Sequence, residues 1–212
     1  MSFQSIINYA SDISIERKPV VAQSVTRDGT VRSVSRGGNT WRFEVTVPSG
    51  IRWSTIKSDI SKAEELGRLN QDNIQFNDPG HSWLFEYSGD QPDPTTIQVQ
   101  FSNTVERSLD ILGGVTISSG YLFRAGDIVQ LTDGVNIGYV YTVRDDVPWN
   151  EIRIPLHRPK LSNEPTYTGT PTMRIGPNCR FTVKCIQFPT WRLFERDQVA
   201  WDGTFLFQEV IS

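Results

Sequence analysis

The sequence lacks an excess of basic residues. Its 212 residues include 21 Lys and Arg against 24 Asp and Glu, which gives a formal net charge of −3. A protein whose main activity is nucleic-acid binding carries a surplus of positive charge, because it must neutralise phosphates. We therefore exclude stable nucleic-acid binding as the main activity of this chain.

Long apolar runs are also missing. A helix that crosses a bilayer needs about 20 consecutive apolar residues, and no stretch of this chain has that character. The start, MSFQSIINYASDISIERK, has neither the apolar core nor the basic leader of a signal peptide. We expect no membrane partner and no export by the usual routes.

Cysteine is scarce. Cys179 and Cys185 are the two cysteines, and they lie in CRFTVKC, where apolar and polar residues alternate as in a strand. Along an extended strand their separation is roughly 20 Å, whereas a disulfide requires Cα atoms within about 7 Å. We predict that both are reduced and buried, which suits assembly in a cytoplasm.

Histidine is equally scarce. His81 and His157 are the two histidines, and each lies alone in the sequence, whereas a zinc site gathers about three or four ligands. The chain has no G-x-S-x-G elbow and no P-loop, although a triad assembled in space stays open. We expect no metal, no cofactor, and a surface or structural role for both histidines.

Acidic pairs are the strongest sign of catalysis, because glycosidases use two carboxylates. The candidates lie on the polar side of a predicted helix or in turns, where Asp hydrogen-bonds the backbone. The segment DQPDPTT lacks the downstream bidentate Glu of a calcium loop. We predict that the chain is not an enzyme. The pairs considered are Asp145 with Asp146, Asp90 with Asp93, and Glu64 with Glu65.

The strongest positive signal is the stretch 39–67. Residues 41–47 alternate apolar and polar side chains, the period of a half-buried strand. After a Pro-Ser-Gly stop, apolar residues recur at every third or fourth position and predict an amphipathic helix over about 54–66. Ser54 can serve as its N-cap and Gly67 as its C′ residue. We expect the apolar face of the strand to pack on this helix.

Short β-rich runs with turn residues between them fill the rest of the chain. Asp28-Gly29 and Gly37-Gly38 predict tight hairpin turns, hence a three-stranded meander that leads into the helix. The predicted fold class is mainly β, an antiparallel sandwich or barrel with one flanking helix. Further predicted strands lie at 73–76, 83–87, 97–101, 127–131, 139–143 and 151–157, followed by TMRI, CRFTVKCIQF, WRLF and TFLFQEVI.

The domain organisation follows from the same pattern. Residues 1–19 form an N-terminal arm or irregular entry, and residues 20–212 form the β domain. The Pro- and Asp-rich loop 88–96 is a candidate joint that would divide the β domain into 20–90 and 97–212.

Aromatic residues are plentiful, with six Trp, six Tyr and eleven Phe. Most occupy alternating strand positions, which is typical of a core. Trp149, Trp191 and Trp201 lie instead beside Pro or Asp at predicted strand ends. Such positions suit interface anchors or, less often, platforms on which sugars stack.

Three runs resemble segments of tail and baseplate structural proteins of tailed bacteriophages. They are GDIVQLTDGVNIGYVYTVRDDVPWNEIRIPLHRP, SVSRGGNTWRFEVTVPSG with the helix that follows it, and FTVKCIQFPTWRLFERDQVAWDGTFLFQEVI. The resemblance implies a virion protein with a fold related to the tail tube, a non-enzymatic subunit of the baseplate hub or of a distal tail ring. It also implies as partners copies of the chain in a trimer or hexamer, tail-tube and baseplate proteins, and DNA only in transit through the channel.

A ring subunit needs segments that cross to a neighbour. The arm 1–19 and the polar excursion 158–171 suit that role, because neither has a self-sufficient apolar pattern. We expect a chain without residues 1–15 to fold as a monomer and to lose assembly. A channel that passes DNA should be polar and not net positive, because Lys and Arg would hold phosphates.

Two other classes stay open. A receptor- or carbohydrate-binding module of a phage tail would use Trp149, Trp191 or Trp201 in a shallow aromatic groove. A peptidoglycan hydrolase would need two carboxylates that face each other across a cleft.

Overall fold

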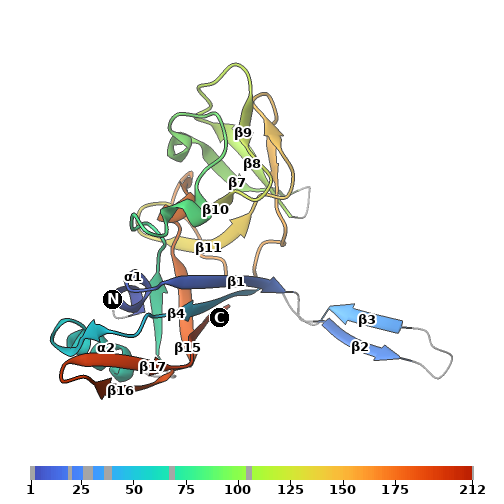
Figure 1. Cartoon of the computed structure of the whole chain (residues 1–212). Coiled ribbons are helices and arrows are strands. Elements are labelled where there is room, and N and C mark those ends of the chain that lie inside the picture. Colours follow the sequence, from blue (N-terminus) through green and yellow to red (C-terminus); the bar gives the residue numbers. More distant parts are fainter. Residues whose placement is uncertain are drawn as a thin grey trace. The chain divides into compact units, whose positions relative to one another are not determined.

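The computed structural model describes residues 3–18, 21–25, 31–35, 40–66, 70–103 and 107–211. The chain divides into two compact units (Figure 1). Unit 1 comprises residues 1–74 and 182–212, and unit 2 comprises residues 75–181. Unit 2 is therefore inserted in the sequence of unit 1, and the predicted joint at 88–96 falls inside unit 2.

Unit 1 contains a five-stranded antiparallel sheet with the order β1-β4-β18-β15-β6. The N-terminal β1 and the C-terminal β18 both pair with β4, so the two ends of the chain meet in one sheet. This confirms the predicted antiparallel β class. The strands are β1 (Asp12–Lys18), β4 (Thr40–Thr46), β6 (Gln71–Ile74), β15 (Phe181–Gln187) and β18 (Phe205–Glu209).

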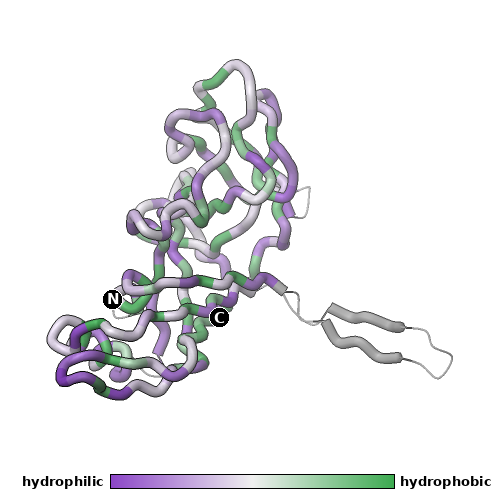
Figure 2. The backbone as a smooth tube through the Cα atoms, in the orientation of Figure 1, coloured by the Kyte–Doolittle hydropathy of each residue, from purple (hydrophilic) through white to green (hydrophobic). Residues whose placement is uncertain are grey.

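Strand β4 shows the predicted alternation. Trp41, Phe43 and Val45 are buried, whereas Arg42 and Glu44 are exposed. Figure 2 shows hydrophobic and hydrophilic segments following one another at short intervals along the chain. One face of β4 therefore belongs to the core, and its other face is polar.

The structure corrects the prediction that residues 1–19 form an arm or irregular entry. Residues Phe3–Asn8 form helix α1, and β1 follows it as a full strand of the sheet. The Phe3 ring lies 5.2 Å from the Phe207 ring, and the Phe3 amide donates to the Asp72 carboxylate at 3.1 Å. Phe3, Ile6 and Ile7 of α1 are thus buried, and β1 pairs with β4, so the segment is ordered within unit 1.

The predicted meander is confirmed in its first half only. Strands β2 (Val21–Val25) and β3 (Val31–Ser35) pair as a hairpin, whose predicted turn lies outside the described residues. The predicted pairing of β3 with β4 is wrong, because β4 pairs with β1 and β18. A Gly-Gly turn permits a hairpin, but the partner of a strand is decided by which apolar face it shares.

The predicted helix is confirmed as α2 (Trp53–Leu66). Its buried residues Ile56 and Ile60 pack with Val199 in a small sheet, rather than on the face of β4 as predicted. Ser54 donates its amide and its hydroxyl to the Asp197 carboxylate at 3.3 Å each, so a distant residue caps the helix. Gly67 lies outside the described residues. The small sheet consists of β16 (Thr190–Phe194), β17 (Gln198–Asp202) and β5 (Ile51–Arg52).

Unit 2 is built of three small antiparallel sheets with the orders β11-β10-β14, β13-β8-β7 and β12-β9. Strand β10 is buried along its whole length between β11 and β14. Apolar residues of all three sheets, from Ile97 to Ile175, form one core cluster. The strands are β7 (Gln98–Phe101), β8 (Ser108–Gly113), β9 (Tyr121–Phe123), β10 (Ile128–Thr132), β11 (Ile137–Thr142), β12 (Val147–Pro148), β13 (Arg153–Pro155) and β14 (Thr172–Ile175).

The structure also corrects the prediction that residues 158–171 cross to a neighbouring subunit, because this segment is anchored within unit 2. The buried Glu164 carboxylate accepts hydrogen bonds from the Tyr141 hydroxyl at 2.7 Å and from the Tyr167 hydroxyl. Arg158 donates to the Val140 carbonyl at 2.6 Å. A few buried polar anchors thus order a segment that has little apolar pattern.

Both cysteines are free and buried, as predicted. In β15 the apolar positions Phe181, Val183 and Cys185 are buried in alternation. Cys179 precedes the strand, and burial raises the pKa of its thiol. The protonated, inert form is therefore favoured.

The burial of α1 generates a prediction. Replacing Phe3 with Ala removes a fully buried ring and should lower the free energy of unfolding by about 3 kcal/mol or more. Asn8→Ala, on the exposed side of the same helix, should change it by less than about 1 kcal/mol. Urea unfolding measures both. Equal, small losses would show that α1 does not contribute to the core.

Candidate functional site

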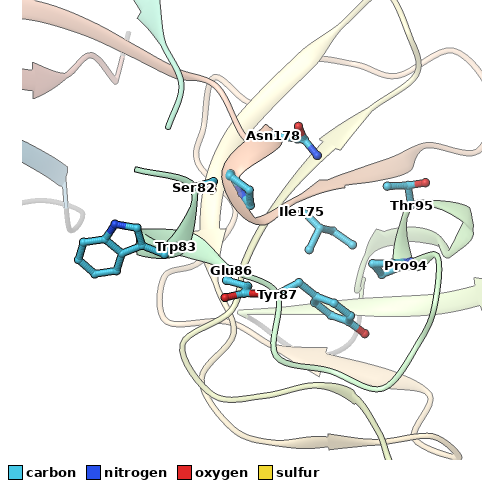
Figure 3. A pocket seen from close by; sticks show the side chains of 9 residues that line it. Ser82, Trp83, Glu86, Tyr87, Pro94, Thr95, Ile175 and Asn178 are labelled. Atoms are coloured by element: carbon cyan, nitrogen blue, oxygen red, sulfur yellow. The ribbon is translucent and has the colours of Figure 1, made fainter. Parts of the chain in front are cut away.

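The most exposed tryptophan of the described chain is Trp83, and it lies in unit 2. Residues Ser82–Phe85 form the 3₁₀ helix η1, so the predicted strand at 83–87 is wrong. The Trp83 side chain is 66% exposed, while Phe85 packs against Phe76 and Phe181 with ring centroids 5.5 and 5.7 Å away. The helical turn thus directs the Phe85 ring toward other aromatic rings and leaves Trp83 at the surface, where Figure 3 shows its indole.

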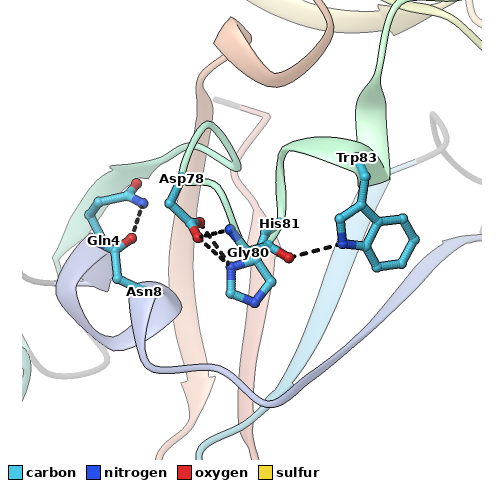
Figure 4. A network of polar contacts seen from close by, with 6 residues as sticks. All are labelled: Gln4, Asn8, Asp78, Gly80, His81 and Trp83. Atoms are coloured by element: carbon cyan, nitrogen blue, oxygen red, sulfur yellow. Dashed lines mark hydrogen bonds and ion pairs between the residues drawn. The ribbon is translucent and has the colours of Figure 1, made fainter.

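The turn before η1 holds Trp83 in place. The Asp78 carboxylate accepts a hydrogen bond from the Gly80 amide at 2.9 Å and pairs with the His81 ring Nδ1 at 2.8 Å. The Trp83 indole N–H donates to the Gly80 carbonyl at 2.9 Å (Figure 4). Asp78 is thus the local turn-forming carboxylate that a Pro-Gly sequence favours, and His81 has the structural role that we predicted.

A close backbone approach holds η1 against η3 (Gly176–Asn178). Gly176 has φ +61°, and a Cβ atom there would lie 2.6 Å from the Phe85 carbonyl oxygen. Only glycine fits at that distance.

A pocket of about 470 Å³ opens between these segments and η2 (Pro94–Thr96). Figure 3 shows Trp83 at one edge of the pocket, with its indole turned outward, and Pro94 and Thr95 at the opposite edge. Asp93 caps η2 by accepting from the Thr95 amide at 3.1 Å, which positions this end. The lining combines aromatic, apolar and uncharged polar groups with one carboxylate, among them Trp83, Glu86, Tyr87, Pro94, Ile175 and Asn178.

Tyr87 forms a rigid wall of the pocket. Its hydroxyl donates to the Leu122 carbonyl and accepts from the Gln91 amide at 3.3 Å, and its ring meets Phe123 edge-on at 5.8 Å. Burial raises the pKa of Tyr87 to about 12, and the charges of Asp127 and Asp90 act in the same direction. The Tyr87 hydroxyl is therefore neutral and engaged with the backbone.

A second pocket, of about 350 Å³, is lined by Trp83, Leu84 and Phe85 of η1 and shares Trp83 and Glu86 with the first. It is also lined by Asp127, whose buried carboxylate accepts from the Ser88 amide at 3.0 Å and from the Arg124 amide at 2.8 Å. Burial raises the pKa of Asp127. This Asp and Gln130, which bonds the Gly138 and Arg180 carbonyls at 2.6 and 2.7 Å, belong to the GDIVQ run that carries the phage-tail resemblance.

Five of the six carboxylates in the acidic pairs considered from the sequence accept structural hydrogen bonds. Asp90 accepts from the Tyr121 amide at 2.8 Å, Asp146 from the Ala125 amide at 2.9 Å, and Asp145 from the Arg144 guanidinium at 2.8 Å. Glu64 of unit 1 accepts from the Trp191 indole at 3.0 Å. Within the described ranges, no cluster of three or more His, Cys, Asp or Glu side chains forms a potential metal site.

Two of the three tryptophans selected from the sequence are brought together, because Trp191 on β16 lies opposite Trp201 on β17. Trp191 stacks on Trp53 at 4.9 Å, and Trp201 meets Phe205 edge-on at 5.1 Å, so both contribute to the packing of unit 1. Trp149 belongs to unit 2 and is 42% exposed. The sequence analysis missed Trp83, because the period of a strand would have placed it in the core.

Comparison with known proteins adds no relative. No family model and no curated protein sequence matches the chain. The part of the chain that the structure describes contains no helix of the length and apolarity that a bilayer requires.

The arrangement around Trp83 is suited to binding, because it presents a preorganised aromatic surface beside groups that form hydrogen bonds.

The approach of η3 to η1 generates a prediction. Gly176→Ala should lower the free energy of unfolding by about 3 kcal/mol, because it adds a clash to an unfavourable φ. Gly134→Ala is the matched control, with φ +91° but no atom within 4 Å of the added Cβ, and should cost about 1 kcal/mol. Chemical denaturation compares them. Equal costs would contradict the close contact.

The environment of Tyr87 predicts a pH effect. Its pKa in the folded protein, about 12, exceeds the unfolded value of about 10. The folded state therefore keeps the proton longer, and stability falls as pH rises from about 10 through 12. Phenolate absorbance is titrated against pH for the wild type and for Tyr87→Phe. The difference between the two curves reports Tyr87 and should have its midpoint near pH 12. Circular dichroism verifies that both proteins stay folded. A midpoint near 10 would contradict the buried position.

Proposed function

We propose that this chain is a structural, non-enzymatic subunit of a phage tail, in the baseplate hub or in a distal tail ring. Support comes from the three sequence runs that resemble tail and baseplate proteins and from the five-stranded sheet of unit 1. That sheet has the two features that a ring subunit needs: edges at which another copy can pair, and a polar face that can line a channel.

The edges of the sheet are β1 and β6. β1 spans seven residues, and its register with β4 runs from Asp12 to Lys18. An edge strand of this length is a template for pairing with another chain. Pairing between β1 of one copy and β6 of the next would be a head-to-tail contact, which forms a ring when the rotation between successive copies closes.

The polar face of the sheet mixes both signs of charge. Glu16 lies opposite Arg42, and Ser14 lies opposite Glu44. On the next strands Gln208 lies opposite Arg42 and Lys184 lies opposite Gln208. The same face also contains one buried apolar residue, Leu206, opposite Glu44. A wall with acidic and basic side chains interspersed has no run of Lys and Arg to hold phosphates. This is the face that we assign to a channel through which DNA passes.

A pair of proline variants tests the ring. Successive amides of an edge strand point alternately to the paired and the open side. Of Ser14→Pro and Ile15→Pro, one therefore removes an amide that faces β4 and the other removes an amide that faces the open edge. One variant should lose stability because it breaks a bond to β4. The other should keep its melting temperature within a few degrees and lose assembly.

The purified full-length chain and both variants are compared by sizing chromatography, negative-stain electron microscopy and thermal unfolding. We expect closed rings for the wild type and single subunits for the stable variant. Wild-type chain that stays monomeric at high concentration, or rings that persist in both variants, would contradict the proposed function.

A further inference from the structure

The two pockets of unit 2 adjoin along η1, with Trp83 and Glu86 common to both linings. We propose that together they bind a neutral oligosaccharide, with the Trp83 indole as the stacking platform. This binding activity is independent of ring formation, because every residue that carries it belongs to unit 2.

The orientation of Trp83 is the first argument. Its N–H is already engaged with the Gly80 carbonyl, while the side chain remains 66% exposed. The indole therefore offers a ligand an apolar, electron-rich surface and no donor. The C–H face of a pyranose ring is apolar and slightly positive, so it complements the negative face of an aromatic ring. Because the turn at Asp78 already holds the ring, little conformational freedom is lost on binding.

The polar groups around the first pocket are the second argument. Ser82, Glu86, Thr95 and Asn178 surround an apolar centre that includes Ile175. Hydroxyls, a carboxylate and a primary amide can each donate to or accept from sugar hydroxyls. A saccharide presents that combination, with hydroxyls around the rim of a ring and C–H groups on its faces. The Thr95 hydroxyl already donates to the Asp93 carboxylate at 2.5 Å, so it can only accept from a ligand. A purely apolar ligand would bury the Glu86 carboxylate without offering it a donor.

Charge and size select the class of saccharide. The described lining residues include the carboxylates Glu86 and Asp127 but no Lys or Arg, so phosphorylated, sulfated or sialylated ligands would be repelled. The same argument rejects a nucleic acid that stacks its bases on Trp83. Pockets of about 470 and 350 Å³ that share Trp83 and Glu86 in their linings suit several linked rings better than one.

The test uses the full-length chain and four neutral probes: maltotetraose, cellotetraose, chitotetraose and mannotetraose. Calorimetric titration should show binding of at least one probe with a dissociation constant of about 1 mM or lower. Trp83→Ala should weaken that binding by about tenfold or more. Trp149→Ala, which removes the exposed tryptophan outside both pockets, should leave it unchanged.

Folding and assembly are monitored separately. Trp83→Ala should keep the wild-type melting temperature and oligomeric state, because the side chain is largely exposed. Absence of binding to all four probes, binding that survives Trp83→Ala, or equal loss in Trp149→Ala would each overturn the proposal. Binding of oligothymidylate or of a phosphorylated glycan in preference to the neutral probes would overturn it as well. None of these results depends on ring formation.

Discussion

The pairing of β4 with β1 on one side and β18 on the other is the constraint on which unit 1 depends. It joins the first and last strands of the chain and aligns Ile15, Phe43 and Phe207 on the core face. Helix α1 then covers that face through Phe3. A sheet closed in this way by distant segments tolerates the insertion of a complete unit between two of its strands, because the insertion leaves the aligned core face intact.

Unit 2 depends on polar contacts more than its sequence indicates. Gln130, Asp127 and Glu164 are buried, and each satisfies several hydrogen-bond donors or acceptors of the backbone or of tyrosine hydroxyls. Such contacts position loops for which an apolar pattern alone is too sparse. The same strategy operates at the surface, where Asp78 and Asp93 fix the turns on which Trp83 and Thr95 are presented.

Local periodicity predicted the elements well and their partners poorly. The alternation of β4, the stripe of α2, the hairpin β2–β3 and the burial of Cys185 follow from side-chain spacing within a few residues. The partner of β4 and the sheet under α2 do not, because several apolar faces in the chain are of similar size and only tertiary packing selects among them. The candidate site was missed for a related reason. A strand would place Trp83 and Phe85 on the same face, whereas the helical turn at 82–85 separates them and leaves Trp83 exposed.

By itself, the sequence determined the antiparallel β class, the one long helix, the reduced cysteines and the absence of a basic surplus, because each depends on composition or on spacing along the chain. Tertiary structure alone decided that the N-terminal segment is a strand of the core sheet, that Asp197 caps α2, and that Trp83 lies exposed between two pockets. These features require residues far apart in sequence to meet, and no local pattern specifies which of them do.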